Sequence, residues 1–186
     1  MSPLIRLIVM VAVWGAWMVP FFVNRARGQG KAVKIDPRAR LGIVIGSAGF
    51  FIANTHRPGV WGESIELWRG ALGVVLGMFA ILLVWTAVGN LGKQWRVDAG
   101  LNADHVLVQS GAYRVVRHPI YLSMILMLAM NIAMVGTLPG WPIALALGIA
   151  GTEIRVRVED SLLSTRFGAD FTEWQKRVPA YLPWVR

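Results

Sequence analysis

Long apolar runs dominate this chain and constrain its fold more than any other feature. Three of them, residues 3–23, 67–91 and 120–138, are close to the roughly 20 residues that an α-helix needs to cross a bilayer. Hydrophobic residues make up 55% of the sequence, against roughly 45–50% in ordinary soluble domains. The sequence therefore predicts an all-α integral membrane protein, built as one bundle of about five transmembrane helices.

Two further apolar runs complete the predicted bundle. Residues 41–54 are only 14 residues, so this run either crosses with the help of its neighbours or re-enters the membrane. Its Gly42 and Gly46 form a pair of small residues four apart, a pattern that favours close helix packing. A fifth run begins at Trp141, directly after Pro139-Gly140. This short connection predicts a C-terminal hairpin of the fourth and fifth helices.

The charged residues between the apolar runs predict how the chain is oriented. With the N-terminus outside, the inner loops and the C-terminal tail hold 16 Lys and Arg residues, and the outer segments hold 3, namely Arg6, Arg57 and Arg69. The positive-inside rule then places the C-terminus in the cytoplasm. The net charge of +9 lies in these loops, which indicates membrane lipid headgroups as its partner rather than nucleic acid. A re-entrant 41–54 segment would instead move the N-terminus inside.

Composition limits the remaining possibilities. The chain has no cysteine, which excludes disulfides and thiolate metal sites. Only Arg6 precedes the first apolar run and no small-residue cleavage site follows it, so we expect a retained helix rather than a signal peptide. The polar stretches lengthen after Asn90. We therefore predict that residues 1–89 are a scaffold of transmembrane helices and that residues 90–186 form the catalytic half of a single structural domain.

The densest cluster of polar residues is 111–121, directly before the fourth apolar run. Pro119 is placed to be the first residue of that helix, with His118 near the N-cap. Free N–H groups at a helix start attract a carboxylate or a phosphate, and Arg114 and Arg117 add positive charge beside them. The stretch predicts an anion-binding helix start at the membrane surface. The alternative is the ordinary basic flank of a membrane helix.

A second polar cluster lies where the fifth helix continues past the membrane. Arg155 and Glu159 are four residues apart and share a helix face, and an ionisable pair at a membrane boundary is a functional candidate. The alternative is an interfacial salt bridge of little energetic value. Gly168 is placed to end this helix. The tail beyond it, with Phe171 and Trp174, either folds back over the helix starts as a lid or lies along the interface.

The motifs of this half resemble one enzyme family when they are taken in order. Gly-x-Tyr-x-x-x-Arg-His-Pro-x-Tyr at 111–121 is followed by Glu159-Asp160, Phe167-Gly168, Val178-Pro179 and Leu182-Pro183. This ordered set resembles the isoprenylcysteine carboxyl methyltransferase family, which is related to the phospholipid N-methyltransferases, and it covers about half of the chain. The resemblance implies a membrane-embedded enzyme that uses S-adenosylmethionine in a cytosol-facing pocket and takes a lipophilic substrate from the bilayer.

The resemblance also implies roles for individual residues. Arg155 and Glu159 are the implied catalytic residues: Arg155 would orient the acceptor group, and Glu159 would also bind an amine or hydroxyl of the cofactor. No metal ligand is implied. The implied cofactor-binding residues are His105, Leu107, Val108, Gly111, Tyr113, Arg117, His118, Pro119, Tyr121 and Glu159.

The chain departs from the family pattern at a few positions. Asp160 stands where members often carry a second glutamate, and Phe171 and Trp174 stand at two tyrosine positions. The acceptor therefore stays open between a carboxylate, such as an isoprenylcysteine-like group, and an amine or a thiol. A carboxylate needs no general base, whereas an amine or thiol would need one, with Glu159 or His118 as candidates. The expected partners are a lipophilic or lipidated substrate and membrane lipids.

Two other functions remain open at this stage. The first is a membrane reductase using NADPH, because the sterol reductases resemble the same C-terminal architecture. Their tails usually carry Arg-Asp near the positions of Glu159-Asp160. The second is a non-catalytic membrane scaffold. The presence of Arg117, His118 and Glu159 together argues against a scaffold, which needs none of the three. The sequence leaves the oligomeric state open.

Overall fold

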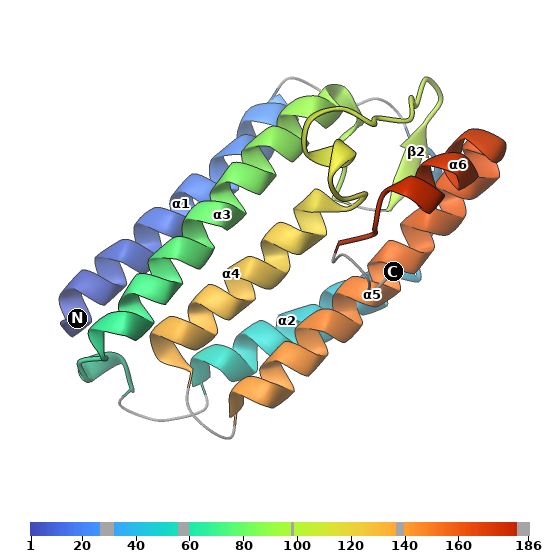
Figure 1. Ribbon diagram of the computed structural model, residues 1–186. Helices are drawn as coiled ribbons and strands as arrows, with labels where there is room; N and C mark the ends of the chain where they lie inside the picture. The colour runs from blue at the N-terminus through green and yellow to red at the C-terminus, as the bar shows by residue number, and fades with distance from the viewer. Residues whose placement is uncertain (27–31, 56–59, 98, 137–139, 182–186) are drawn as a thin grey trace.

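The computed structural model describes residues 1–26, 32–55, 60–97, 99–136 and 140–181. Its long helices lie side by side in a bundle, with a small β-ribbon and a short C-terminal helix at one end (Figure 1). The elements in chain order are α1 (Pro3–Ala26), β1 (Ala32–Ile35), α2 (Ala39–Thr55), η1 (Val60–Gly62), α3 (Leu67–Leu91), η2 (Gly92–Gln94), β2 (Gly100–Asn102), η3 (Gly111–Arg114), α4 (Pro119–Val135), α5 (Gly140–Phe167) and α6 (Ala169–Arg177).

The helices form where the apolar runs predict them. Among the described residues, Pro3–Arg25 and Leu67–Gln94 are long and apolar enough to cross a membrane, while α2 and α4 are shorter apolar helices. α2 and α4 have 17 residues each, about 25 Å of helix, which is slightly less than the roughly 30 Å of the hydrocarbon layer. The helical membrane architecture is confirmed, and the count of five spans remains a prediction.

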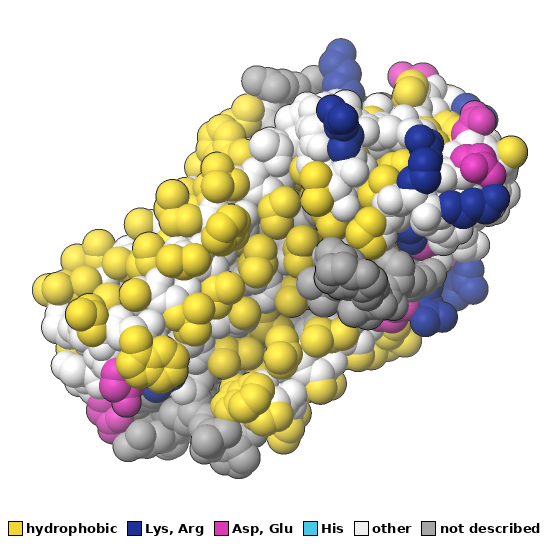
Figure 2. Space-filling view, viewed as in Figure 1, with side chains coloured by type: hydrophobic (Ala, Val, Ile, Leu, Met, Phe, Trp, Pro, Cys, Tyr) yellow, Lys and Arg dark blue, Asp and Glu magenta, His cyan; other side chains and the backbone are white. Residues whose placement is uncertain are grey.

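The surface separates apolar from charged side chains along the bundle. Large apolar side chains are exposed on α1 and α3, among them Phe22 at 63% and Phe79 at 57%. Figure 2 shows hydrophobic side chains over the lower left of the molecule, whereas most charged side chains gather at the end that holds β2 and α6. An apolar surface of this extent needs lipid or another cover to be stable in a cell.

α2 and α5 approach each other through glycines. A Cβ atom added at Gly42 would lie 2.5 Å from the carbonyl oxygen of Gly151, and one added at Gly151 would lie 2.5 Å from the backbone nitrogen of Gly46. Because apolar side chains gain little from packing together within lipid, small residues that let backbones meet are a main source of helix association. The predicted close packing at Gly42 and Gly46 is confirmed.

Two arginines from other helices cap the C-terminal end of α4. Arg6 of α1 is fully buried and donates from Nη1 to the Met134 carbonyl at 3.2 Å. Arg69 of α3 donates from Nε to Ala133 at 3.0 Å and from Nη2 to Gly136 at 2.8 Å. These carbonyls have no partner within the helix. The two positive charges also offset the negative end of the helix dipole.

The ribbon of β1 and β2 differs from the predicted all-α fold. The strands pair antiparallel, with Ala32 opposite Asn102 and Ile35 opposite Gly100. The backbone N–H of Asp36 extends the pairing to the Ala99 carbonyl at 3.0 Å. The reason is topological: the chain leaves α1 and α3 at the same end of the bundle, where the two connections satisfy each other's backbone groups. Val33 and Ile35 favour a strand, but the segment has only four residues and its partner, residues 100–102, has no such preference, so the sequence alone does not indicate the pairing.

The two helices of the predicted C-terminal hairpin, α4 and α5, lie close to where the sequence predicts them. α5 is a single helix of 28 residues, about 42 Å long, so it extends beyond a lipid core of roughly 30 Å. It ends at Phe167, and Gly168 follows with φ of +51°, which confirms the predicted break. α4 ends at Val135 rather than at residue 138. Pro139, Arg57 and Leu182-Pro183, which also entered the sequence argument, lie outside the described residues.

Candidate functional site

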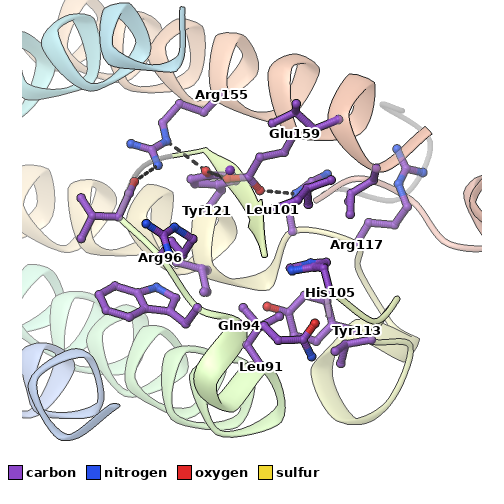
Figure 3. Close-up of a pocket in the computed structure, with 18 of the residues that line it drawn as sticks. Leu91, Gln94, Arg96, Leu101, His105, Tyr113, Arg117, Tyr121, Arg155 and Glu159 are labelled. Atoms are coloured by element: carbon purple, nitrogen blue, oxygen red, sulfur yellow. Dashed lines mark hydrogen bonds and ion pairs between the residues drawn. The ribbon is translucent and has the colours of Figure 1, made fainter. Parts of the chain in front are cut away.

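A cavity of about 380 Å³ lies at the end of the bundle that holds the ribbon, within the usual range for small-molecule sites. Figure 3 shows Arg155, Tyr121 and Glu159 grouped on one side of it, and His105 with Tyr113 on another. All of the predicted site residues except Gly111 and Pro119 line this cavity. Those that do are His105, Leu107, Val108, Tyr113, Arg117, His118, Tyr121, Arg155 and Glu159.

The start of α4 forms as predicted, but the tail occupies part of it. His118 is the N-cap and Pro119 is the first helical residue. The backbone N–H groups of Arg117 and His118 donate to the carbonyls of Pro179 and Ala180, each at 2.8 Å. The tail therefore folds back over the helix start, which confirms the first of the two alternatives for this segment. Pro119 is buried and shapes the turn into the helix.

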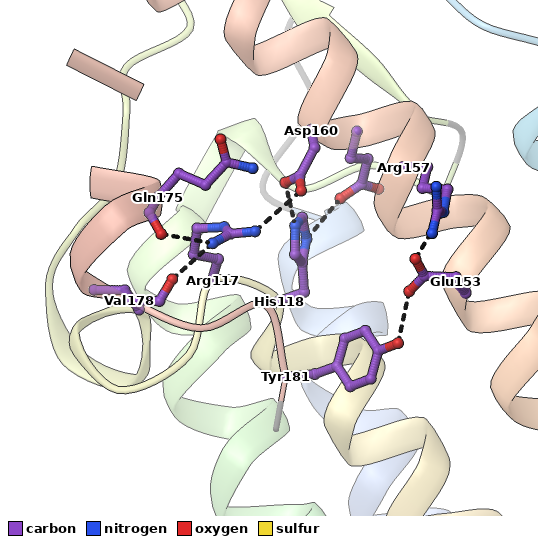
Figure 4. Close-up of polar contacts among 9 residues, drawn as sticks. Arg117, His118, Glu153, Arg157, Asp160, Gln175, Val178 and Tyr181 are labelled. Carbon is purple, nitrogen blue, oxygen red and sulfur yellow. Dashed lines mark hydrogen bonds and ion pairs between the residues drawn. The ribbon is translucent and has the colours of Figure 1, made fainter. Parts of the chain in front are cut away.

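Asp160 is the centre of a buried ion cluster that the sequence did not predict. Its Oδ2 lies 3.1 Å from Arg117 Nη2 and its Oδ1 lies 2.8 Å from His118 Nε2. Arg117 Nη1 donates to the carbonyls of Val178 at 2.7 Å and Gln175 at 3.2 Å (Figure 4). Arg117 thus binds the tail and Asp160, and Arg114 is exposed. The anion that pairs with Arg117 is thus a side chain of the protein itself, and binding of an external anion at this helix start stays a prediction.

Sequence reasoning had one signal for Asp160. It stands directly after Glu159 in the motif, at a position where the family pattern often has glutamate, but this position does not reveal its partner. Neither residue spacing nor charge pattern links it to Arg117, because the two residues lie 43 positions apart in the chain. Only the packing of α5 beside the start of α4 brings them together.

His118 lies between two carboxylates of α5. Its Nδ1 is 3.5 Å from Glu159 Oε2, opposite the contact of Nε2 with Asp160. Burial by itself lowers the pKa of His118, but the hydrogen bonds to Asp160 and Glu159 outweigh burial and raise the pKa above its ordinary value. The two carboxylates therefore favour the protonated ring, which can donate from both nitrogens. This favours Glu159 over His118 as the candidate general base.

Arg155 and Glu159 are joined through Tyr121. Arg155 Nε donates to the Tyr121 hydroxyl at 3.0 Å, and the guanidinium lies over the tyrosine ring, 5.1 Å from its centre. Arg155 Nη2 donates to the Val97 carbonyl at 2.8 Å. The Tyr121 hydroxyl in turn donates to Glu159 Oε1. The arrangement is a buried, oriented network rather than the exposed salt bridge considered as the alternative.

Three buried polar groups of the cavity lining have no hydrogen-bond partner among the described residues: His105 Nδ1, Arg117 Nε and Trp174 Nε1. Burial lowers the pKa of His105, so its ring is neutral. Burial raises the pKa of Tyr113, so its hydroxyl stays protonated. Buried polar groups in native proteins are nearly always paired with protein or water, so unpaired groups around a cavity are available to a bound ligand or to water.

Gly111 positions the loop rather than lining the cavity. Its φ is +58°, a conformation that favours glycine, and a Cβ atom there would collide with the Asn90 side chain. The residues just before it, Leu107 and Val108, pack with Tyr113 and Trp174 in one apolar cluster. This cluster forms the apolar wall of the cavity.

A second cavity, of about 690 Å³, lies between α1, α2 and α4. Trp17 and Met124 line both cavities, so the two adjoin. Asn131 also lines the second cavity, and its Nδ2 donates to the Met127 carbonyl of its own helix at 2.7 Å. Most residues that line the second cavity are apolar, namely Leu7, Met10, Val11, Trp14, Trp17, Phe50, Trp61 and Met124. The polar site therefore lies next to an apolar space within the bundle.

These features define a class: helical integral membrane proteins with a buried polar pocket at one end of the bundle. Comparison with protein-family models gives the family itself. The model of the isoprenylcysteine carboxyl methyltransferase (ICMT) family matches residues 72–165, half of the chain, and the chain belongs to the ICMT family. The match begins within α3 and stops before α6.

Among the described residues, no group of three or more His, Asp or Glu side chains could hold a metal ion.

Two relatives are similar over most of this chain. It is 29% identical over 155 residues to a protein-S-isoprenylcysteine O-methyltransferase of Tribolium castaneum, which covers 81% of this chain and 53% of the relative. It is 29% identical over 137 residues to the cobalt-zinc-cadmium resistance protein CzcN of Cupriavidus metallidurans, with 73% of this chain and 57% of that protein covered. The chain spans little more than half the length of these relatives.

A solved structure has the same fold. The structure of the eukaryotic intramembrane Ras methyltransferase ICMT, without a monobody, superposes with a TM-score of 0.60 and covers 95% of this chain and 68% of that one. The sequence identity is 21%, so the likeness concerns the fold alone. It agrees with the family assignment and with a protein that resides in the membrane.

Proposed function

We propose that this protein transfers the methyl group of S-adenosylmethionine to a lipophilic or membrane-associated acceptor. The observation that carries the proposal is the cavity at the ribbon end of the bundle, which the Arg155–Tyr121–Glu159 network shares with the unpaired groups of His105 and Trp174. Membership of the ICMT family supports the reaction type. Of the relatives reported above, two are named as methyltransferases and none as a reductase.

The residues of the cavity fit this cofactor. It carries a base, hydroxyls, an amine and a carboxylate, and the unpaired His105 and Trp174 nitrogens offer hydrogen bonds to such groups. The Glu159 carboxylate suits its amine, and aromatic faces such as that of Tyr113 suit a sulfonium cation. When bound, the cofactor supplies an electrophilic methyl group. The protein holds the ligand still and excludes water, which favours an in-line displacement on carbon.

The acceptor end of the cavity is Arg155. Two of its nitrogens bind Tyr121 and Val97, and Nη1 has no hydrogen-bond partner among the described residues. A carboxylate bound at Nη1 is oriented by a guanidinium that is itself held in place. We therefore propose a carboxylate acceptor, of which an isoprenylcysteine-like group is the first to test. The adjoining apolar cavity would take the hydrocarbon part of such a molecule. The pocket faces the cytoplasm in the proposed topology.

Calorimetric titration of the detergent-purified protein tests the proposal. S-adenosylmethionine and its demethylated product should both bind with micromolar affinity. Glu159→Ala and His118→Ala should abolish binding in a protein that is still folded by circular dichroism, while Glu173→Gln, an exposed control, should not. Trp174→Phe keeps the ring and removes the unpaired donor, and should weaken binding about 5-fold to 10-fold, the value of one hydrogen bond.

Two results would contradict the proposal. If neither S-adenosylmethionine nor its demethylated product binds while NADPH protects the protein from thermal unfolding, the reductase function replaces the one proposed here. If the cofactor binds equally well to the wild type and to both alanine variants, the site assignment is wrong. Methyl transfer to an isoprenylcysteine-like carboxylate, against matched amine and thiol compounds, then identifies the acceptor class.

A further inference from the structure

Arg155 is positioned by α2 as well as by its hydrogen bonds. A Cβ atom added at Gly42 would lie 2.7 Å from Arg155 Cγ and 3.4 Å from the Arg155 backbone nitrogen, in addition to its approach to the Gly151 carbonyl. The first distance is shorter than real Cβ contacts allow. The aliphatic part of the Arg155 side chain therefore lies directly against the bare backbone of Gly42, in the space where any other residue would place a side chain.

The other glycines of α2 do not have this relation to the site. A Cβ atom at Gly46 would meet nothing within 4 Å. One at Gly49 would lie 2.6 Å from the Ala144 carbonyl, so it is equally tight against α5, but it is about two helical turns, or roughly 10 Å, from Gly42. Of these three glycines, Gly42 is the one whose missing side chain makes room for a functional group.

We infer that Gly42 is a positioning residue for Arg155: the absence of a side chain at Gly42 sets where the Arg155 guanidinium lies. With its stem against α2, Arg155 reaches both the Tyr121 hydroxyl and the Val97 carbonyl. A methyl group at Gly42 displaces the stem and breaks this geometry. The inference rests on the proposed function where it concerns catalysis. It gives the N-terminal half of the chain a part in the site, since the neighbouring Ile43 also lines the cavity.

The structure also indicates where a displaced side chain would go. A small cavity of about 70 Å³ lies between α2, α4 and α5, and Gly42, Tyr121 and Arg155 all line it. This volume exceeds that of a methylene group, so the Arg155 stem has room to move away from an added methyl group. The contact of that methyl group with the Gly151 carbonyl separates α2 and α5 locally, as the contact at Gly49 would do in its own variant. Gly42→Ala is therefore expected to fold with the guanidinium out of place.

The experiment compares Gly42→Ala with two matched variants, Gly46→Ala and Gly49→Ala. Nitrogen-15 spectra of the arginine side chains in detergent report the Arg155 Nε resonance, which is assigned by its loss in Arg155→Lys. Gly42→Ala should shift this resonance and lower kcat about 10-fold, with the affinity for S-adenosylmethionine unchanged within 2-fold. Gly49→Ala should lower the melting temperature while leaving the resonance and kcat as in the wild type. Gly46→Ala should change none of these.

An unshifted Arg155 resonance in folded Gly42→Ala overturns the inference, whatever the protein catalyses. A shifted resonance in a protein that transfers no methyl group retains the positioning and rejects the proposed function. Loss of kcat in Gly49→Ala equal to that in Gly42→Ala assigns the effect to helix packing and also overturns it. If Gly42→Ala does not fold, the same substitution is made in a protein that already carries Arg155→Ala. The inference requires that Gly42→Ala lowers the free energy of unfolding less in this protein, where the Arg155 stem is missing, than in the wild type. An equal loss in the two proteins contradicts the inference.

Discussion

At the scale of residues, the site is organised by alternating charges. Arg117 contacts Asp160, Asp160 contacts His118, and His118 contacts Glu159, all at the start of α4. Each buried charge has a neighbour of opposite sign, which a low-dielectric interior requires. Because removal of one member leaves a buried charge without compensation, the cluster is sensitive to single substitutions.

Asp160→Asn tests this cluster. The amide keeps the size of the side chain but removes the charge that faces Arg117 and His118. The free energy of unfolding should fall by about 3 kcal/mol, as when a buried pair is broken. Denaturant or thermal unfolding in detergent measures it. The exposed Lys176–Glu173 pair is the control: Glu173→Gln should cost less than about 1 kcal/mol, and an equal loss in both variants would contradict the assignment.

The raised pKa of His118 predicts a pH dependence of stability. Because the folded state binds the proton more tightly than the unfolded chain, whose His pKa is about 6.5, the stabilisation is complete below about pH 6.5 and is lost as the pH rises through the higher folded-state pKa. The melting temperature of the wild type should therefore exceed that of His118→Asn most at the acidic end, with the gap narrowing toward alkaline pH. A gap that widens with pH would mean that His118 is neutral.

At the scale of elements, α4 is fixed at both ends. Its start is bonded to the tail through Arg117 and His118, and its C-terminal carbonyls are bonded by Arg6 and Arg69. The helix that carries Tyr121 into the cavity is thus held by interactions from α1, α3 and the chain beyond α6. This explains how a short apolar helix can place a side chain in a fixed position.

Arg69→Ala tests the C-terminal cap of α4. It leaves the carbonyls of Ala133 and Gly136 without their charged partner. The melting curve should show a loss of about 1–2 kcal/mol, the value of charged hydrogen bonds at a helix end. The affinity for S-adenosylmethionine should stay unchanged, since the cap and the cavity are at opposite ends of α4. Arg38→Ala, in an exposed pair with Asp36, is the control and should cost less. A loss of affinity in Arg69→Ala would show that the cap also shapes the site.

At the scale of the whole molecule, the charge distribution defines two ends. The cavity, the ribbon and α6 share the charged end, while apolar side chains cover much of the remaining length (Figure 2). If the chain has five spans, the positive-inside rule predicts that this end faces the cytoplasm and that the N-terminus lies outside.

Cysteine labelling tests this topology cleanly, because the natural chain has no cysteine. Single variants Arg38→Cys, Glu63→Cys and Lys176→Cys are treated with a membrane-impermeant maleimide on intact cells and after lysis. We expect Glu63→Cys to react in both cases, and Arg38→Cys and Lys176→Cys only after lysis. Labelling of Arg38→Cys and Glu63→Cys on the same side would show that α2 re-enters instead of crossing.

Much of this structure follows from local pattern. The apolar runs locate the long helices, Pro119 and His118 mark the start of α4, and Gly168 marks the end of α5. These are effects of neighbouring residues on one another, such as capping, proline geometry and hydrophobic length. The ribbon and α6 are too short to be stable alone, so they form where packed helices give them partners.

The sequence by itself determined the membrane character, the helix positions, the family and the polar residues at the centre of the site, such as Arg155 and Glu159. The tertiary structure alone decided which of them bond to each other. Asp160 binds Arg117 and His118, Tyr121 stands between Arg155 and Glu159, and Gly42 makes room for Arg155. The physical reason is range: helix signals act over a few neighbouring residues, whereas a buried ion pair depends on how two distant helices pack, which no short stretch of sequence encodes.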